Sequence, residues 1–144
     1  MRQAVFVHLA GGSEPVSYSW TFSAAGTAVG TVAAYSGVDP VTPIDAHDGQ
    51  VTSSSASITA PSITTTAANT MLVDVSLMVG KTTIGPPATM TERIEVVSPG
   101  GVSSKLTQAL ADALQAGIGP TGTRVATGGS SAHNIGALIA LRPD

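Results

Sequence analysis

Two stretches of the chain alternate between apolar and polar side chains, and this period of two is the strongest constraint on the fold. Residues 16–23 alternate apolar and hydroxyl side chains over eight positions. Residues 71–79 repeat the pattern, with five apolar side chains expected to point inward: Met71, Val73, Val75, Leu77 and Val79. Successive side chains of a β-strand point to opposite faces, so both stretches are predicted to be half-buried strands.

Six further stretches have a strand-like composition and are separated by turns rich in glycine and proline. They are residues 3–9, 28–35, 57–60, 91–97, 121–127 and 134–141. The separating turns include residues 11–15, 37–43, 85–87, 99–101 and 128–129. Many short strands with frequent turns predict an all-β fold, here a single antiparallel β-sandwich domain over residues 1–144.

Residues 103–116 fit two kinds of secondary structure. The leucines of this stretch recur at the four-residue spacing of one helix face: Leu106, Leu110 and Leu114. Aligning residues 4–35 with residues 108–141, however, gives a weak internal two-fold repeat with the same order of strands and turns. The repeat makes residues 106–114 the counterpart of a predicted strand. We therefore predict a strand, although the spacing alone favours a helix.

Charged residues make up only 10% of the chain, and this excludes several classes of protein. A coiled coil needs many Glu, Lys and Arg residues on its exposed faces. A disordered chain combines low hydrophobicity with high net charge, whereas here 42% of residues are hydrophobic and the net charge is −3. Six scattered basic residues cannot form a nucleic-acid-binding patch, so we expect no nucleic-acid partner.

The absence of cysteine excludes a disulfide scaffold, a thiolate zinc site and a cysteine nucleophile. No stretch has the 18 consecutive apolar residues of a membrane-spanning helix, so we expect no membrane insertion. Residues 1–10 match a signal peptide poorly, because His8 interrupts the apolar run. We therefore expect either a piece of a longer secreted protein or a protein released by cell lysis, as phage components are.

Five short motifs, taken in order, resemble those of a widespread β-sandwich module of bacterial and phage proteins. They are residues 12–22 (GSEPVSYSWTF), 34–39 (AYSGVD), 60–66 (APSITTT), 86–93 (PPATMTER) and 139–143 (IALRP). The resemblance implies a jelly-roll-like antiparallel sandwich of the kind found in secreted multidomain proteins, adhesins and phage tail or surface proteins. It implies no known catalytic activity.

The chain departs from this family at its beginning. Members usually carry about fifty more residues before the first motif, and their opening strands have no counterpart here. Without those strands, one sheet edge would lack a neighbour and one apolar sheet face would be uncovered. We therefore predict an oligomer or a part of an assembly, in which contacts between subunits replace the missing strands. A smaller sandwich that closes over the gap is the alternative.

Residues 39–49 bring together three carboxylates and a histidine: Asp39, Asp45, Asp48 and His47. Such carboxylates could bind Ca²⁺, which takes six to eight oxygen ligands. The spacing matches no EF-hand loop, and Pro40 and Pro43 divide the segment. Aspartate before proline or glycine commonly initiates a turn. We predict a loop with turn-forming aspartates and no metal site.

Two glycine patterns resemble nucleotide-binding motifs only formally. Residues 117–122 spell G-x-G-x-x-G but lead into a predicted strand, whereas the dinucleotide motif needs a helix whose N-terminus holds the pyrophosphate. Residues 80–82 resemble the end of a phosphate-binding loop, but Val75 stands where its first glycine is required. We predict no bound cofactor.

The sequence also gives little evidence for catalytic residues. No serine lies in a nucleophile elbow, and His8 and His133 are expected to be structural, within or beside strands. Glu92 and Glu95 are expected on opposite faces of a strand, so they cannot converge as the acid pair of a glycosidase. We predict that the protein is not an enzyme.

Tyr18, Trp20 and Phe22 share one face of the predicted strand 16–23. An exposed row of aromatic rings could stack against sugars. The chain has only five aromatic residues, however, and large aromatic side chains are usually needed to fill the hydrophobic core. We predict that these three side chains lie in the core.

The leading hypothesis is a non-enzymatic structural protein on the exterior of a phage particle, as a decoration, fibre or tail component. Its expected partners are further copies of itself or other virion proteins. The alternatives are a carbohydrate-binding or adhesive module of a secreted bacterial protein, located outside the cell or on its surface, and an exported filament subunit.

Overall fold

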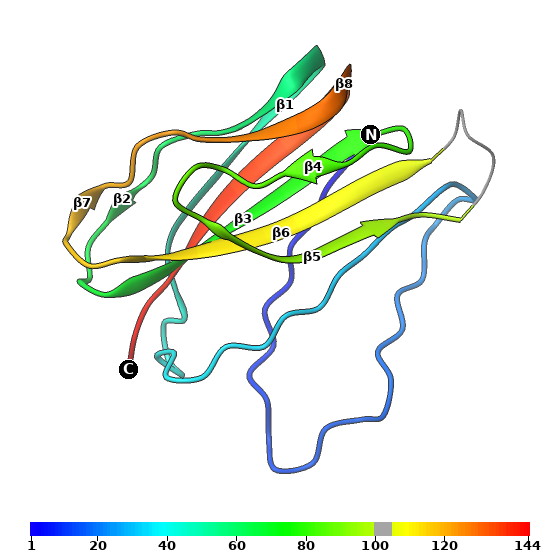
Figure 1. Ribbon diagram of the computed structural model, residues 1–144. Coiled ribbons are helices and arrows are strands. Elements are labelled where there is room, and N and C mark those ends of the chain that lie inside the picture. The colour runs from blue at the N-terminus through cyan, green and yellow to red at the C-terminus, as the bar shows by residue number, and fades with distance from the viewer. Residues whose placement is uncertain (100–104) are drawn as a thin grey trace.

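A computed structural model describes residues 1–99 and 105–144, which form β-strands, turns and extended segments and contain no helix. Its strands are β1 (Ile44–Ala60), β2 (Thr64–Thr65), β3 (Thr70–Val79), β4 (Ile84–Gly85), β5 (Thr91–Val97), β6 (Leu106–Gln115), β7 (Gly119–Pro120) and β8 (Arg124–Leu141). They build an antiparallel β-sandwich, so the predicted all-β class is confirmed (Figure 1). A jelly-roll connection order stays a prediction. Among the described residues, a helix able to cross a membrane is likewise absent.

The main sheet has the strand order β1-β8-β3-β6-β5, with β4 as an additional partner of β8. Every pairing in it is antiparallel. β3 lies at the centre, with β6 on one side and the C-terminal half of β8 on the other. Strands β2 and β7 form a separate two-stranded ribbon.

Both β1 and β8 are long enough to contribute to two layers. Residues 134–141 of β8 pair with β3, whereas residues 124–127 pair only with the far end of β1 and with β4. Two of the three register shifts in β1 lie on either side of Ser55, and such bulges bend a strand. The buried Asn134 side chain donates hydrogen bonds to the Ser55 and Ser57 carbonyl oxygens, at 2.9 and 3.3 Å. The Asn134 amide therefore holds the bend in place.

The bent ends of β1 and β8 cover one side of the sheet, here called the inner face. Two clusters fill the space between the layers, one around Leu72 and the other around Met78. The first contains Ala60, Ile63, Leu72, Met90, Ala111, Leu138 and Ala140, and the second Ile58, Met78, Ile84, Ala109 and Ala126. At the closest approach, a Cβ atom added to Gly136 would lie 2.5 Å from the Thr59 carbonyl oxygen. Only glycine lets the two layers come this near.

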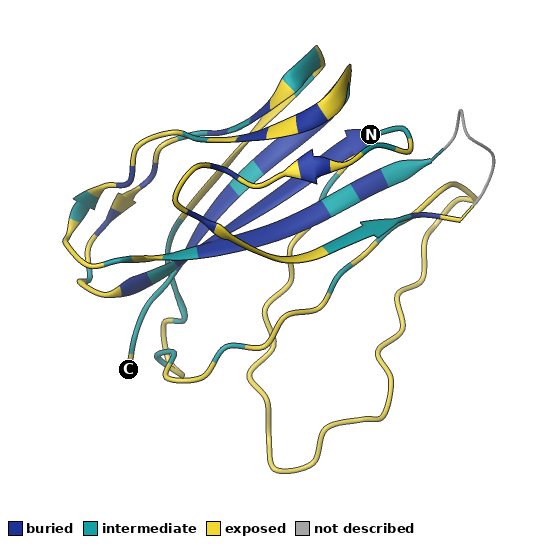
Figure 2. Cartoon of the chain, viewed as in Figure 1, coloured by how far each residue is buried: buried dark blue, intermediate teal, exposed yellow. Residues whose placement is uncertain are grey.

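The opposite side of the sheet, here called the outer face, is also apolar. Val73, Val75, Leu110 and Ile139 form a third buried cluster there, against which Tyr35 packs. Its cover is the N-terminal segment, residues 1–36, which runs past the sheet as a wide extended loop (Figures 1 and 2). The sequence predicted that only alternate residues of 71–79 point into the protein. The structure buries both faces of β3, because Leu72 and Met78, on the other face, are also fully buried.

The three N-terminal strands were predicted wrongly. Residues 3–9, 16–23 and 28–35 are extended but form no strand, and no backbone hydrogen bond joins residues 1–36 to one another or to the described sheet. Alternation creates an amphipathic ribbon, but a strand also needs a neighbour to satisfy its N–H and C=O groups. These residues have no such neighbour within the described chain.

The strand predicted over part of residues 103–116 is confirmed as β6, Leu106–Gln115; residues 103–104 lie outside the described range. A four-residue leucine spacing is a multiple of two, so it also fits a strand. The repeat that led to this prediction finds no support, because residues 108–141 are largely strands whereas residues 4–35 are not. Residues 71–79 and 91–97 are confirmed as β3 and β5.

Two predicted turns lie inside strands instead. Gly128 and Gly129 belong to β8, which joins the two strands predicted at 121–127 and 134–141. A Cβ atom on Gly128 would lie 2.5 Å from the Met78 sulfur, so this glycine makes room for the core. The predicted loop 39–49 ends early, because β1 begins at Ile44 and continues through the stretch predicted at 57–60.

Replacing Gly136 with alanine should destabilise the fold by about 1–3 kcal/mol, because the new methyl group would overlap the Thr59 backbone. Urea unfolding measures this loss. Gly49→Ala is the matched control in the same sheet, since its Cβ would make ordinary contacts at 3.5 Å. Equal midpoints for the two variants would contradict the close approach of the layers.

A carboxylate is enclosed between the layers. Asp74 on β3 is 1% exposed, and its Oδ2 accepts a 2.7 Å hydrogen bond from the Ser76 hydroxyl. Its Oδ1 has no hydrogen-bond partner among the described residues. Burial raises the pKa of Asp74 to about 6, although the Ser76 hydroxyl and the positive charge of Arg124 act in the opposite direction. The charged form is therefore disfavoured in the folded protein.

Between pH 4 and pH 7, Asp74 should lower the free energy of unfolding by up to about 3 kcal/mol, because the folded state holds its proton more tightly than the unfolded chain. Asp74→Asn removes this loss. The variant should match the wild type near pH 4 and exceed its stability at pH 7, measured by urea unfolding at both values. An asparagine variant that is no more stable at pH 7 would be inconsistent with this role.

Candidate interaction surface

The N-terminal segment exposes most of the large apolar side chains that the protein leaves in contact with water. Those exposed by at least 45% are Val5, Phe6, Val7, Leu9, Val16, Tyr18, Trp20, Phe22 and Val32. Among residues 1–34, only Gln3, Val29 and Thr31 are half-buried; the others are exposed (Figure 2). A contiguous group of this kind marks an interaction site more often than it marks an ordinary monomer surface.

The aromatic row was predicted to lie in the core, and this prediction is wrong. Tyr18, Trp20 and Phe22 are 45%, 54% and 68% exposed, because no second layer of strands lies over them. The Tyr18 and Trp20 rings lie side by side, with centroids 6.3 Å apart, and the His8 ring meets Tyr18 edge-on at 6.2 Å. The three neighbouring rings form an exposed aromatic patch.

Glu14 lies beside this patch and accepts a hydrogen bond from the Tyr18 hydroxyl. This bond, together with one from the Gly11 N–H, holds the pKa of Glu14 below its usual value. The Nε2 atom of His8 lies 3.3 Å from a Glu14 carboxylate oxygen. His8 thus belongs to an exposed segment, and its predicted place in a strand is wrong. A carboxylate next to exposed aromatic rings can accept hydrogen bonds from a polar ligand.

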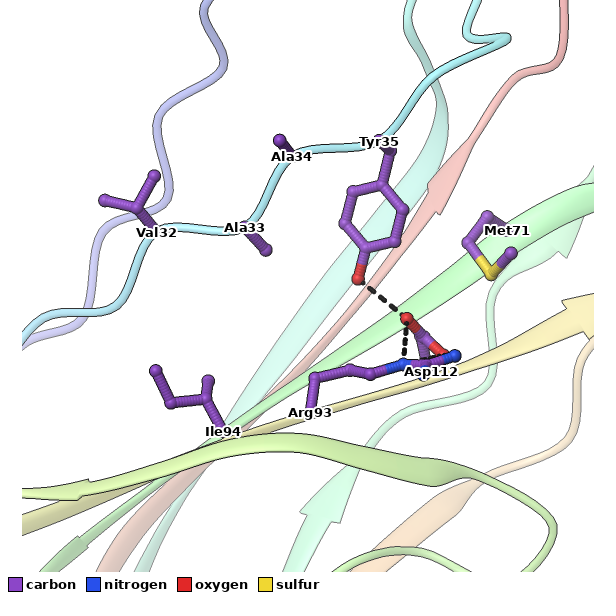
Figure 3. A pocket seen from close by; sticks show the side chains of 8 residues that line it. All are labelled: Val32, Ala33, Ala34, Tyr35, Met71, Arg93, Ile94 and Asp112. Carbon is purple, nitrogen blue, oxygen red and sulfur yellow. Dashed lines mark hydrogen bonds and ion pairs between the residues drawn. The ribbon is translucent and has the colours of Figure 1, made fainter.

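Tyr35 attaches the end of the segment to the outer face (Figure 3). Its hydroxyl donates to Asp112 Oδ2 at 3.0 Å, and burial followed by this bond raises the pKa of Tyr35 to about 12. Asp112 also accepts from Arg93 Nε at 2.9 Å, and Arg93 Nη2 lies 2.8 Å from Oδ1. The Asp112 side chain is only 5% exposed. Arg93 therefore neutralises a carboxylate that is shielded from water.

A cavity of about 470 Å³ lies between the end of the segment and the sheet. Its lining is Val32, Ala33, Ala34, Tyr35, Met71, Arg93, Ile94 and Asp112 (Figure 3). The polar groups at its floor bind one another, which favours a structural role for them rather than a catalytic one. Sequence reasoning missed this cluster because its members are far apart in the chain and share no motif.

The carboxylates predicted to form turns are dispersed. Asp39 accepts hydrogen bonds from the backbone N–H groups of Thr42 and Val41, which hold its pKa below the usual value. Burial of Asp45 opposes its ionisation, but hydrogen bonds from Thr66 and Ala67 still lower its pKa.

Asp48 and His47 lie in β1, as Asp45 does. Asp48 accepts from the Gly49 N–H, and His47 is exposed. Across residues 1–99 and 105–144, no three such side chains gather as a metal site would require.

Glu92 and Glu95 were predicted on opposite faces of β5, and this is wrong. A bulge at Arg93 shifts the register, so the two glutamates lie opposite Ala111 and Ala109, which share the inner face of β6. The Oε2 atom of Glu95 accepts a 2.5 Å hydrogen bond from the Ile84 N–H. Glu95 therefore has a structural role, because its carboxylate holds the backbone of β4.

The remaining motifs lie in connections and strands. The 117–122 glycine pattern spans β7 and the turn before β8 and is followed by a strand. Gly80 opens the turn after β3 with a φ of 110°. His133 lies in β8, with its Nδ1 atom 3.1 Å from the Ser53 carbonyl oxygen, so its placement in a strand is confirmed.

Comparisons of the chain with family models, curated proteins and solved structures found no match.

Removing the Tyr35 hydroxyl should cost about 1–2 kcal/mol of stability, because the shielded Oδ2 of Asp112 loses one of its two donors and keeps only Arg93 Nε. Tyr18→Phe is a matched control, since that hydroxyl also donates to a carboxylate but lies on the exposed segment. The control should change the free energy of unfolding by less than about 0.5 kcal/mol. Similar losses in both variants, measured by urea unfolding, would argue against an anchoring role for Tyr35.

Proposed function

We propose that this protein is a non-enzymatic structural component that assembles with other proteins through its N-terminal segment and its sheet edges. The observation that carries the proposal is the row of large apolar side chains exposed along residues 5–32. Water contact with that many apolar groups is unfavourable, and a partner surface that buries each of them would gain about 1.5–3 kcal/mol per side chain.

The sheet edges support the same role. β1 and β5 are the outer strands of the main sheet, and each has a neighbour on one side only. Proteins commonly protect such edges with proline or with charged residues such as lysine. The β1 strand carries few charges: its stretch 51–60 has none and is rich in serine and threonine. This edge is suited to pairing with a further strand.

The proposed location is the exterior of a phage particle, as a decoration, fibre or tail protein. Two features support it: the neutral, hydroxyl-rich surface and the ordered motifs that resemble a phage and bacterial surface module. Further copies of the chain or other virion proteins are the proposed partners. An exported filament subunit would use the same edges.

The test is purification of particles from a lysate of cells that carry the gene. The chain should sediment with intact particles through a density gradient and remain bound after washing in high salt, because an apolar interface resists salt. Deletion of residues 1–34 should release it. A chain that stays in the soluble fraction at every step would overturn the virion assignment.

Carbohydrate binding is a second candidate, favoured by the exposed Tyr18 and Trp20 rings beside Glu14. Exposed aromatic rings with a neighbouring carboxylate can hold the apolar face and the hydroxyl groups of a sugar. Binding on a glycan array should disappear in Trp20→Ala and persist in Val32→Ala, which removes an exposed apolar side chain from the same segment. Equal binding by both variants would reject the aromatic patch as the sugar site.

A further inference from the structure

The exposed surface of the chain is larger than its mass requires. The accessible area is 8147 Å², whereas a folded monomer of 14.3 kDa normally exposes about 6,800 Å². The excess, roughly 1,300 Å², exceeds the area of about 800 Å² that each partner contributes to a standard interface. The N-terminal segment is the main source of this excess, since almost all of its residues are exposed.

The segment combines exposed apolar groups with free backbone hydrogen-bonding groups. Residues 1–36 make no backbone hydrogen bond to one another or to the described sheet. Apart from Tyr35, its hydrogen bond to the sheet comes from the Gln3 side chain, which donates to the Val75 carbonyl oxygen at 3.2 Å. A partner that pairs with this backbone and covers the apolar side chains would satisfy both needs at once.

The sequence of the segment is complementary to itself. If two copies of residues 16–22 pair antiparallel around Ser19, Tyr18 of each copy lies opposite Trp20 of the other. In the same register, Val16 lies opposite Phe22. Apolar side chains thus meet apolar ones on one face, and hydroxyl side chains meet on the other. Aromatic cross-strand pairs of this kind stabilise a sheet.

Charge also favours a second copy over a charged partner. Residues 1–36 contain only two formally charged side chains, Arg2 and Glu14. They offer little complementarity to a strongly acidic or basic protein and little repulsion between identical segments. A twofold arrangement uses the same patch on both chains, as symmetric dimers do.

We propose that two copies of this chain form a dimer in which residues 16–22 pair antiparallel about a twofold axis at Ser19. In this shared two-stranded ribbon, each aromatic side chain packs beside an apolar side chain of the other copy, and this contact removes part of its surface from water. The inference deepens the proposed assembly function and rests on it, because it names the partner and the residues of one contact.

Ser19→Cys tests the register directly, because the chain has no other cysteine. Residues directly opposite in an antiparallel pair have Cβ atoms about 4.5–5.5 Å apart, near enough for mild oxidation to join the two copies by a disulfide. In Ser23→Cys the two thiols would lie roughly 26 Å apart along the ribbon. We expect Ser19→Cys to give the disulfide-linked dimer at least tenfold faster than Ser23→Cys.

Sedimentation of the full chain over micromolar concentrations tests association itself, and the single tryptophan, Trp20, reports on the interface. Dimerisation should shift Trp20 fluorescence to the blue and reduce its quenching by acrylamide. Ser19→Pro removes a central N–H from the pairing and should weaken dimerisation at least tenfold. Ala25→Pro, in the same exposed segment but outside the paired stretch, should not. Neither variant should alter thermal unfolding of the sandwich at concentrations where the chain is monomeric.

The alternative outcomes separate the dimer from the broader function. A dimer that is equally stable in Ser19→Pro, with equal cross-linking of the two cysteine variants, would overturn this contact and leave assembly through the sheet edges. A chain that stays monomeric but binds particles would overturn the dimer and support a different virion partner. A monomer that binds neither particles nor itself would overturn both proposals.

Discussion

The close approach between Gly136 and the Thr59 backbone is the contact on which the rest of the structure depends. It allows the ends of β1 and β8 to lie over β3 and enclose two apolar clusters on the inner face. The bulges around Ser55 turn β1 toward this position, and the Asn134 amide donates hydrogen bonds to the carbonyl oxygens of Ser55 and Ser57 at the bend. A single curved sheet thereby supplies both layers of the sandwich.

Within the described chain, the outer face of the sheet has no second layer of strands over it. The central strand β3 has buried apolar side chains on both sides, and its outer side is covered instead by Tyr35 and other groups of the N-terminal segment. The Tyr35–Asp112–Arg93 cluster attaches the end of that segment. The residues before it remain extended and expose apolar side chains to water, while the core beneath the sheet stays closed.

Sequence patterns predicted the strands whose partners lie within the chain. Residues 71–79 and 91–97 alternate and form β3 and β5, and the leucines of β6 fit a period of two as well as they fit a helix. The same alternation failed for residues 16–23, because hydrogen bonds between strands require a neighbour that no local pattern supplies. The bulge at Arg93 likewise reversed the predicted faces of Glu92 and Glu95.

The amino-acid sequence by itself determined the β class, the central strands and the low-charge, hydroxyl-rich surface, because these follow from local alternation and composition. Tertiary structure decided which faces are enclosed, why Gly128 and Gly129 lie inside a strand rather than at a turn, and how Tyr35, Arg93 and Asp112 meet. It also left Tyr18, Trp20 and Phe22 in water. Burial depends on which distant segments pack together, and that choice is made by the packing of the whole chain.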